Sequence, residues 1–128
     1  MALLAKSGTP SLASRTPGAE NRINGIKAGE DIAAGDACYI KSDGYAWRCD
    51  GTAADAKAKF RGMAAGAAQA GEAITLWHDV VFHYGSGMTP GQSFYVAATA
   101  GRLDSAATTG GTVEVAYAID ATRIFVRG

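Results

Sequence analysis

The feature that most constrains the fold is an internal repeat, in which two segments about 56 residues apart share one pattern of residue types. Residues 32–40 (IAAGDACYI) align with residues 88–96 (MTPGQSFYV), and each segment is followed by a glycine, Gly44 or Gly101, and a short second run. Two later pairs of segments correspond in the same way: residues 62–65 with 115–118, and residues 73–76 with 123–126. Each half is therefore expected to form turn, strand, glycine turn, strand, variable loop, strand, turn and strand.

Short β-rich runs separated by Gly-containing turns are typical of a small all-β sandwich or barrel. We expect strands at residues 36–41, 45–49, 60–66, 72–84 with an interruption, 93–98, 101–104, 112–119 and 122–127. A four-strand unit cannot close its own sheet edges, so the halves, residues 28–84 and 85–128, should pair around one core. The predicted fold is all-β: a small duplicated β-sandwich or barrel-like domain over residues 26–128, with an extended N-terminal arm.

The arm is predicted over residues 1–25, which contain Pro10, Pro17, several Gly, Ser and Thr, and no periodic apolar pattern. Such a segment cannot bury enough surface to offset the entropy lost on ordering, so it is either disordered or ordered against a partner. We favour a partner. Three leucines, Leu3, Leu4 and Leu12, would then serve as apolar anchors.

The dipeptide Asp-Gly at residues 43–44 indicates a β-hairpin, because a two-residue type I′ turn needs positive φ at both positions. In that register Ile40 faces Trp47 as a core pair, and Cys38 faces Cys49. The two cysteines would occupy a hydrogen-bonded pair, where the Cα atoms are farther apart than disulfide formation favours. We therefore expect two reduced, buried cysteines.

Residues 52–60 alternate Ala with charged side chains, a pattern that fits either a short helix capped by Thr52 or a polar loop. Lys57, Lys59 and Arg61 lie in and beside this segment without interleaved aromatic residues, unlike a groove for single-stranded nucleic acid. We expect these basic side chains to belong to a solvated loop.

The chain of 128 residues carries 12 Lys and Arg against 12 Asp and Glu, and this balance argues against a nucleic-acid partner. No window approaches the roughly 18 consecutive apolar residues of a membrane-spanning helix, so no membrane partner is expected. The opening MALLA lacks a basic segment before an apolar core, so we expect no signal peptide and synthesis in a cytosol. Two cysteines are too few for a disulfide scaffold or a four-thiolate zinc site.

Catalytic chemistry has little support in the sequence. His78 and His83 are five residues apart, so an extended strand would point them to opposite faces, and His78 and Asp79 would likewise face apart. Ser86 lies between two glycines, which indicates a flexible connector rather than a nucleophile elbow. We therefore predict that the protein is not an enzyme and has no catalytic, cofactor-binding or metal-binding residues.

The order of several short motifs carries a resemblance to a known family. These motifs are residues 28–40 (AGEDIAAGDACYI), Gly44, residues 62–64 (GMA), 70–76 (AGEAITL), 88–96 (MTPGQSFYV) and 100–103 (AGRL). The succession resembles small tailed-phage head-decoration, or capsid cement, proteins over about residues 26–128.

This resemblance implies a virion structural protein that binds the outside of an assembled capsid and bridges neighbouring copies of the major capsid protein. It implies a homotrimer, a place on the capsid exterior after synthesis in the bacterial cytoplasm, and no cofactor. The arm would then lie across the shell and become ordered only when it binds there. The first candidates for contact with the capsid are Leu3, Leu4, Leu12 and Arg15.

Two other functions remain open at this point. Similar Ala/Gly/Thr-rich β modules occur in phage tails and fibre bases, so a structural role there is the nearest alternative. A carbohydrate-binding β domain is a second alternative, with Trp77, Tyr84 or Tyr45 as the sugar platform.

Overall fold

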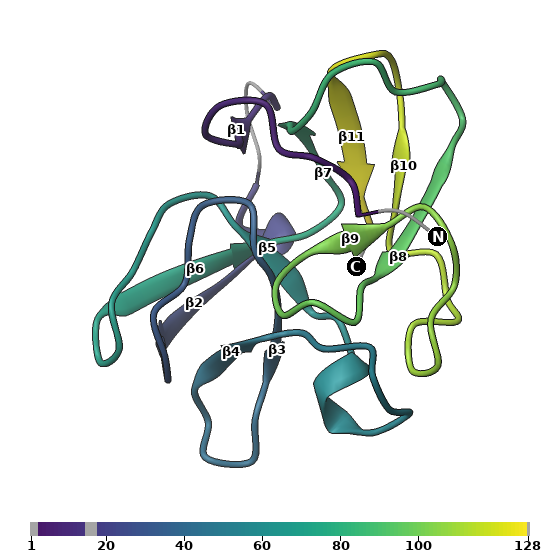
Figure 1. The fold of residues 1–128 in the computed structure, drawn as a ribbon. Coiled ribbons are helices and arrows are strands. Elements are labelled where there is room, and N and C mark those ends of the chain that lie inside the picture. The colour runs from purple at the N-terminus through teal and green to yellow at the C-terminus, as the bar shows by residue number, and fades with distance from the viewer. Residues whose placement is uncertain (1–2, 15–17, 128) are drawn as a thin grey trace.

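The computed structural model describes residues 3–14 and 18–127, and its elements are nearly all strands (Figure 1). Over these residues eleven strands form two antiparallel sheets. Sheet I contains β2 (Arg22–Lys27), β3 (Ala37–Ile40), β4 (Ala46–Arg48), β5 (Gly62–Ala64) and β6 (Ala73–Trp77). Sheet II contains β1 (Ser11–Leu12), β7 (Val80–His83), β8 (Ser93–Val96), β9 (Leu103–Asp104), β10 (Ala116–Ala118) and β11 (Arg123–Val126). The expected all-β class is confirmed.

Helical structure in the described ranges is limited to two 3₁₀ turns, η1 (Ala19–Asn21) and η2 (Ala56–Ala58). No helix within these ranges is long and apolar enough to cross a membrane. The segment for which a short helix or a polar loop was expected contains η2, and its N-cap is Asp55 rather than Thr52. The Asp55 Oδ1 accepts a hydrogen bond from the amide of Lys57 at 3.0 Å.

The two sheets have the same strand order. Sheet I runs β2-β6-β5-β3-β4, and sheet II runs β7-β11-β10-β8-β9, with β1 added beside β7. Neighbouring strands pair antiparallel throughout both sheets. Strands β2 to β6 therefore correspond one by one to β7 to β11, and the sequence repeat is a repeat of topology.

The turns that lead into β3 and β8 show the same correspondence in detail. Gly35 and Gly91 occupy the third turn position with φ of 81° and 85°, where a Cβ would be strained. The amides of Asp36 and Gln92 donate to the carbonyl three residues earlier, at 3.1 and 3.0 Å. The Asp36 side chain also accepts a hydrogen bond from the Ala33 amide at 2.9 Å, and the Gln92 side chain accepts one from the Thr89 amide at 3.4 Å. Each turn is thus closed by backbone and side chain together.

The division between the halves differs from the expected one. The interrupted strand over residues 72–84 is two strands in different sheets, because β6 is the last strand of sheet I in chain order and β7 belongs to sheet II. The chain changes sheets at His78 and Asp79, and Asp79 has φ of 53°, the one positive value among the described non-glycine residues. The topological boundary therefore lies at residues 78–79 rather than between residues 84 and 85.

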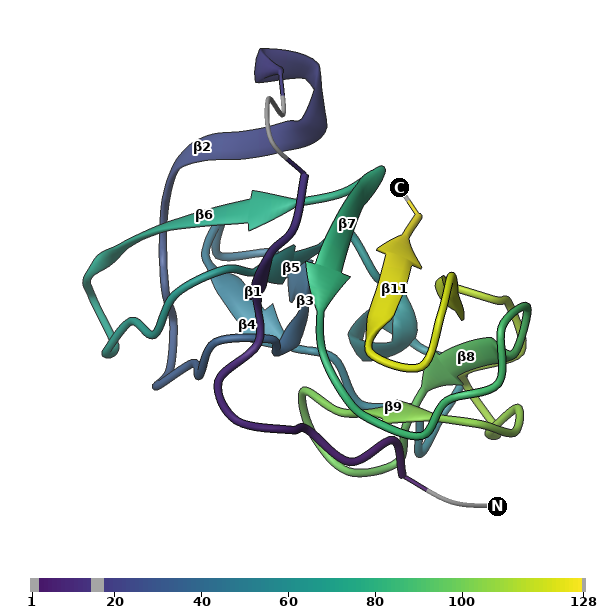
Figure 2. The same cartoon turned by 90° about the horizontal axis from the view of Figure 1, so that it is seen from above.

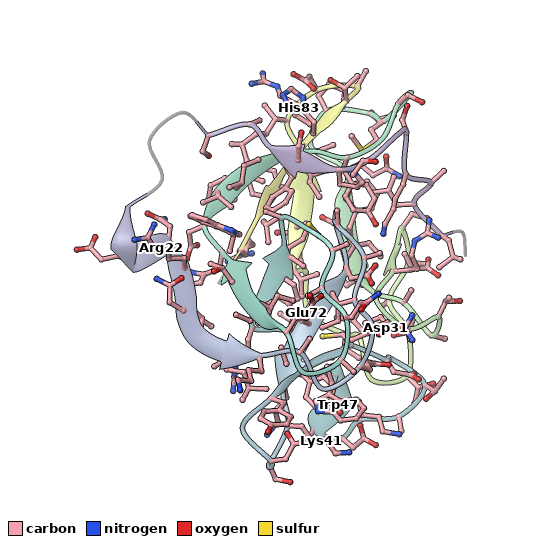
Figure 3. The ribbon with its side chains drawn as sticks, turned by 90° about the vertical axis from the view of Figure 1, so that its left-hand side faces the viewer. Arg22, Asp31, Lys41, Trp47, Glu72 and His83 are labelled. Carbon is pink, nitrogen blue, oxygen red and sulfur yellow. The ribbon has the colours of Figure 1, made fainter. Side chains whose placement is uncertain are left out.

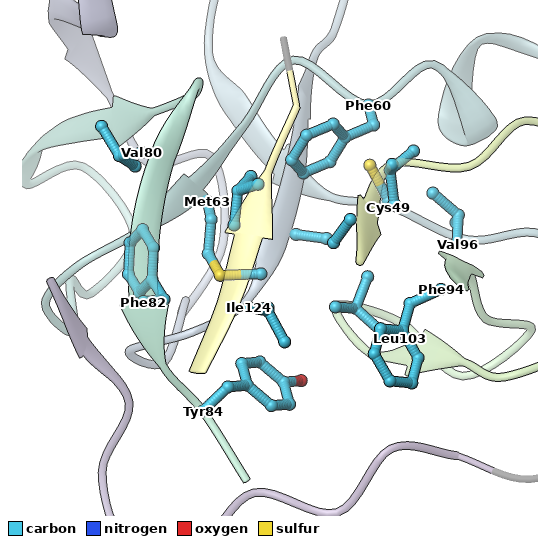
Figure 4. Packing of buried hydrophobic residues seen from close by; sticks show 14 of the residues in the cluster. Cys49, Phe60, Met63, Val80, Phe82, Tyr84, Phe94, Val96, Leu103 and Ile124 are labelled. Carbon is cyan, nitrogen blue, oxygen red and sulfur yellow. The ribbon is translucent and has the colours of Figure 1, made fainter. Parts of the chain in front are cut away.

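The main core lies between the two sheets and contains the large side chains (Figure 4). Met63 of sheet I points toward Phe82 and Ile124 of sheet II, and all three are fully buried. Sheet II buries one face only, so β8 and β11 alternate strictly between partly buried and buried residues. These strands were predicted because apolar side chains alternate along them, and this alternation arises because only one face of the sheet is buried.

A second, smaller core lies on the other face of sheet I. It consists of small and medium side chains: Ala28, Ile32, Cys38, Ala46, Ala64, Ala68, Ile74 and Leu76. Strands β3 and β5 are consequently buried on both faces, and their sequences show no alternation. The alanines of the first half allow the segments around residues 28–34 and 68 to pack closely over this face.

The β3–β4 hairpin has a different register from the expected one. Lys41 donates its amide to the carbonyl of Tyr45 at 3.0 Å, so the loop has three residues, with Gly44 last at φ of 84°. Ile40 therefore faces Ala46, and Trp47 faces Tyr39. The predicted core pair of Ile40 with Trp47 is wrong by one residue, because a third loop residue shifts every pair.

The same shift separates the two cysteines. Cys38 faces Arg48 rather than Cys49, and the Cys49 amide donates to the carbonyl of Ala37 at 2.8 Å. Cys38 belongs to the second core and Cys49 to the main core, since neighbouring pairs point to opposite faces of the sheet. Both thiols are buried and not bonded to each other.

The N-terminal segment lies against the protein's own body. Seen from above, it crosses the molecule beside β7, where β1 adds to the edge of sheet II (Figure 2). The expected boundary at residue 25 falls inside β2, which forms the edge of sheet I. Residues assigned to the arm thus contribute a strand to each sheet.

Candidate docking surface

The leucines predicted as capsid anchors are placed along this N-terminal segment. Leu4 and Leu12 are partly buried and pack against the main core, and Leu12 pairs with Phe82 in the β1–β7 ladder. Leu3 forms an isolated bridge with Asp104 and leaves 42% of its surface exposed. Arg15 lies outside the described residues. Of the three described leucines, Leu3 therefore presents the most surface to a partner.

Polar contacts fasten the same segment to the body. Lys6 Nζ lies 2.9 Å from Asp36 Oδ1 and donates to the Ala34 carbonyl at 3.0 Å. Asp36 is only 4% exposed, so this ion pair neutralises a buried carboxylate. Farther along the chain, Arg102 Nη2 donates to the carbonyl of Leu4 at 2.8 Å. The segment is held at several points by groups distant in sequence.

The tip of the β3–β4 hairpin presents apolar surface. Ile40 and Tyr45 are exposed at 39% and 44%. The Trp47 ring is partly buried, with Lys41 Nζ 4.4 Å from its centroid and its Nε1 donating to Asp43. Figure 3 shows Lys41 and Trp47 together at the end of the molecule formed by this hairpin.

The aromatic residues of a possible sugar platform are not brought together as one surface. Tyr84 is buried at 1% exposure in the main core, so its expected role as a platform is wrong. Trp77 packs against the main core, and the Arg22 guanidinium carbon lies 5.7 Å from its ring centroid. Tyr45 alone of the three candidates is an exposed ring.

A groove of about 460 Å³ lies where the β4–β5 loop meets the β9–β10 loop. These loops are equivalent in the two halves, and both lie toward the lower end of the molecule in Figure 1. Val113, at 71% exposure, lies on its rim and is the most exposed large apolar residue described. Phe60, Val96 and Val115 also line the groove, and they are buried. Sequence reasoning missed this site, because it depends on two loops that lie about 50 residues apart in the sequence.

Two glycines allow these loops to approach closely. A Cβ on Gly110 would lie 2.0 Å from the Ala53 carbonyl oxygen, and a Cβ on Gly51 would lie 2.6 Å from the Val96 carbonyl oxygen. The Gly51 amide donates to the Ala97 carbonyl at 2.8 Å, and the Gly110 amide donates to the Gly51 carbonyl at 2.9 Å. The base of the groove is therefore fixed by backbone contacts between the halves.

The groove lining also contains five charged side chains, three cations and two carboxylates. Arg127 Nη1 lies 2.9 Å from Glu114 Oε1, so these two charges are paired. Lys59 and Arg61 are exposed and make no ion pair with any described residue. With Asp55 as the remaining acid, the lining has a net positive charge.

The residues considered for catalysis lie at the passage between the sheets, on β7 and on the connection after β7. His78 Nδ1 lies 2.8 Å from Asp79 Oδ2, so the expectation that they face apart is wrong: the positive φ of Asp79 turns the chain there. This contact lies at the passage between the sheets, where Asn21 Nδ2 donates to the Asp79 carbonyl. His83 and Ser86 are exposed on β7 and on the connection that follows it.

The two thiols are not in a reactive environment. Burial raises the pKa of Cys38 and of Cys49 far above the ordinary thiol value, although Arg61 acts in the opposite direction on Cys49. Within the described ranges, no group of three or more His, Cys, Asp or Glu residues is arranged to hold a metal ion.

Comparisons with protein-family models, with curated proteins and with solved structures found no match to this chain.

Proposed function

We propose that this chain is a non-enzymatic virion structural protein, which binds the outer surface of an assembled phage capsid and stabilises it by bridging capsid subunits. The motif order across residues 26–128, with its resemblance to head-decoration proteins, supports the choice of phage capsid. The duplicated β-sandwich supports a binding module, since its two equivalent sheets pack around one core and present their connecting loops at the surface.

The observation that carries the proposal is the exposure of large apolar side chains on loops from both halves. Ile40 and Tyr45 lie at the β3–β4 hairpin of the first half, and Val113 lies on the β9–β10 loop of the second half. The larger apolar side chains of the main core are almost fully buried, so the exposed ones on these loops are the apolar side chains left for a protein partner. We assign the contact with the major capsid protein to these loops.

The N-terminal segment has a different part in this proposal from the one expected of an arm. Leu4 and Leu12 already contact the main core, so they stabilise the body rather than reach for the shell. Leu3 remains exposed and is the leucine that a capsid subunit or a second copy would contact. A homotrimer on the capsid exterior, assembled after synthesis in the bacterial cytoplasm, completes the proposal.

Co-sedimentation tests this function. Purified protein is mixed with expanded heads of the phage that encodes the chain, prepared without this protein, and with unexpanded procapsids as the control. Saturable binding to expanded heads is expected, and its plateau gives the copy number. Absence of binding to either particle would overturn the capsid assignment, and antibody labelling of intact virions would then test for a place on the tail or fibre base.

Deleting the first 24 residues is a poor test of the arm, because it removes β1 and half of β2 as well as the buried ion pair. The substitution Leu3→Asp is cleaner, since it changes an exposed side chain and leaves both edge strands in place. Weaker binding of this variant to expanded heads is expected. Unchanged binding would remove Leu3 from the capsid contact.

A further inference from the structure

We propose that the groove between the β4–β5 and β9–β10 loops binds an extended acidic segment with one apolar side chain, contributed by the major capsid protein. The identity of this partner rests on the function proposed above. The chemistry of the segment is inferred from the groove alone, so the two can be tested apart.

The shape of the groove suits part of an extended chain. Its volume of about 460 Å³ lies within the range in which pockets hold small ligands or a few side chains. Phe60 and Val115 form apolar parts of the wall, and Val113 on the rim is 71% exposed. An apolar side chain of the partner would cover Val113 and gain the free energy of removing both surfaces from water.

The groove is already ordered without a partner. On one side, the carbonyl of Asp55 accepts the Ala58 amide at 3.1 Å, and the Arg61 amide donates to the Cys38 carbonyl at 2.9 Å. On the other side, Thr108 Oγ1 donates to the Val96 carbonyl at 2.8 Å. Because both walls are fixed by hydrogen bonds, little conformational entropy of the loops is lost when a partner binds.

Charge selects an acidic partner. Lys59 and Arg61 carry unpaired positive charges on one wall, whereas Glu114 on the other wall is held by Arg127 and by the hydroxyl of Ser93. Asp55 is the one acid of the lining without an ion pair, so an incoming carboxylate gains two cations against one acid and breaks no existing ion pair. Both cations are exposed, so their attraction should weaken as salt increases.

The first experiment uses a synthetic probe and the full chain. We would titrate ¹⁵N-labelled protein with the acetylated, amidated peptide Gly-Glu-Val-Asp-Leu-Glu-Gly, and separately with an analogue that has Lys at each acidic position. The expected result is saturable shift of amide signals in residues 54–61 and 110–115 with the acidic peptide, weakening between 50 and 300 mM NaCl. Shifts elsewhere, or equal binding of the Lys analogue, would overturn the groove assignment.

Matched substitutions identify the groove side chains. Lys59→Glu with Arg61→Glu, and separately Val113→Asp, should each weaken peptide binding at least about fivefold. The controls are Lys27→Glu on the edge strand β2 and Ile119→Asp in the β10–β11 turn, both at exposed positions. Thermal unfolding of all four variants checks that they fold. Equal affinity of groove and control variants would contradict the proposal.

The same variants separate this proposal from the proposed function. If wild-type protein sediments with expanded heads and the groove variants do not, both are supported. If all variants sediment equally, the groove proposal is wrong and the capsid assignment stands. If the acidic peptide binds in the groove but no protein sediments with heads, the capsid partner is wrong while the recognition chemistry stands.

Discussion

Sheets I and II share a strand order but differ in how they are covered. Sheet II buries one face against large side chains such as Phe82 and Phe94, and its other face is at the surface. Sheet I shares that main core and carries an alanine-rich second core on its other face. The same strand order is therefore found in sheet II, which is covered on one face, and in sheet I, which is covered on both. The difference shows that side-chain size, rather than strand order, decides how many layers a repeated unit accepts.

The largest effect expected from this difference concerns thiol reactivity. Cys38 in the second core and Cys49 in the main core should react with iodoacetamide at pH 8 at least about a thousandfold more slowly than a free thiol, because burial raises both pKa values and blocks access. Mass spectrometry of the alkylated protein measures both rates. We expect Cys38 to react first, because it lies in the smaller core, on the outer face of sheet I, whereas Cys49 lies between the sheets. Faster reaction of Cys49 would contradict this expectation.

Truncation in each core is the next largest test. Phe82→Ala should lower the free energy of unfolding by about 3 to 5 kcal/mol, since it removes a fully buried ring between the sheets. Leu76→Ala in the second core should cost about 2 to 4 kcal/mol, because less volume is lost. Urea unfolding of the two variants gives both values. A larger loss for Leu76→Ala would show that the second core carries more stability than its small side chains indicate.

Removal of the ion pair that holds the N-terminal segment should have a smaller effect. Lys6→Met leaves the Asp36 carboxylate buried without its counter-charge, at a cost of about 1 to 3 kcal/mol, less than for a fully buried pair because Lys6 is partly exposed. Adding Asp36→Asn to this variant should recover part of the loss. Lys27→Met is the control on an exposed strand. No recovery in the double variant would assign the loss to packing of the Lys6 side chain.

The smallest effect concerns the tight β10–β11 turn, whose counterpart in the first half is longer. The Thr122 amide and the Arg123 side chain lower the pKa of Asp120 to about 2. Because the folded-state pKa is below the ordinary value, this contribution to stability is present above about pH 4 and is lost as pH falls through about 2. Asp120→Asn should melt slightly below wild type at pH 6, and the two should converge near pH 2. A constant difference across this range would exclude the carboxylate charge as the cause.

The strands of the second half were easier to predict from the sequence, because sheet II buries only one face whereas sheet I is covered on both. Residues 93–96 and 123–126 alternate because one face of sheet II is buried, and these strands were found close to their positions. Strand β2 was missed because its pairing with β6 is interrupted between Ile23 and Ile26, so its apolar residues are three apart instead of two. The hairpin register was missed because Asp-Gly fits a two-residue loop and also the end of a three-residue one.

The candidate site could be predicted only in part. The sequence predicted all three leucines as anchors for a partner, but the burial of Leu4 and Leu12 depends on contacts with residues 70 or more positions away. Lys59 and Arg61 were recognised as solvated, which is correct. That they flank a groove with Val113 depends on the close approach of Gly51 and Gly110, which no local pattern encodes.

The fastening of the N-terminal segment has a consequence for the order of folding. Residues 3–14 leave the ribosome well before their partners, the strand at residues 80–83 and the segment at residues 102–104. Contacts of such high sequence separation form late, because the intervening loop must first be closed. This segment is thus synthesised before both of these partners and docks only after they have folded, so its attachment is a late step in folding.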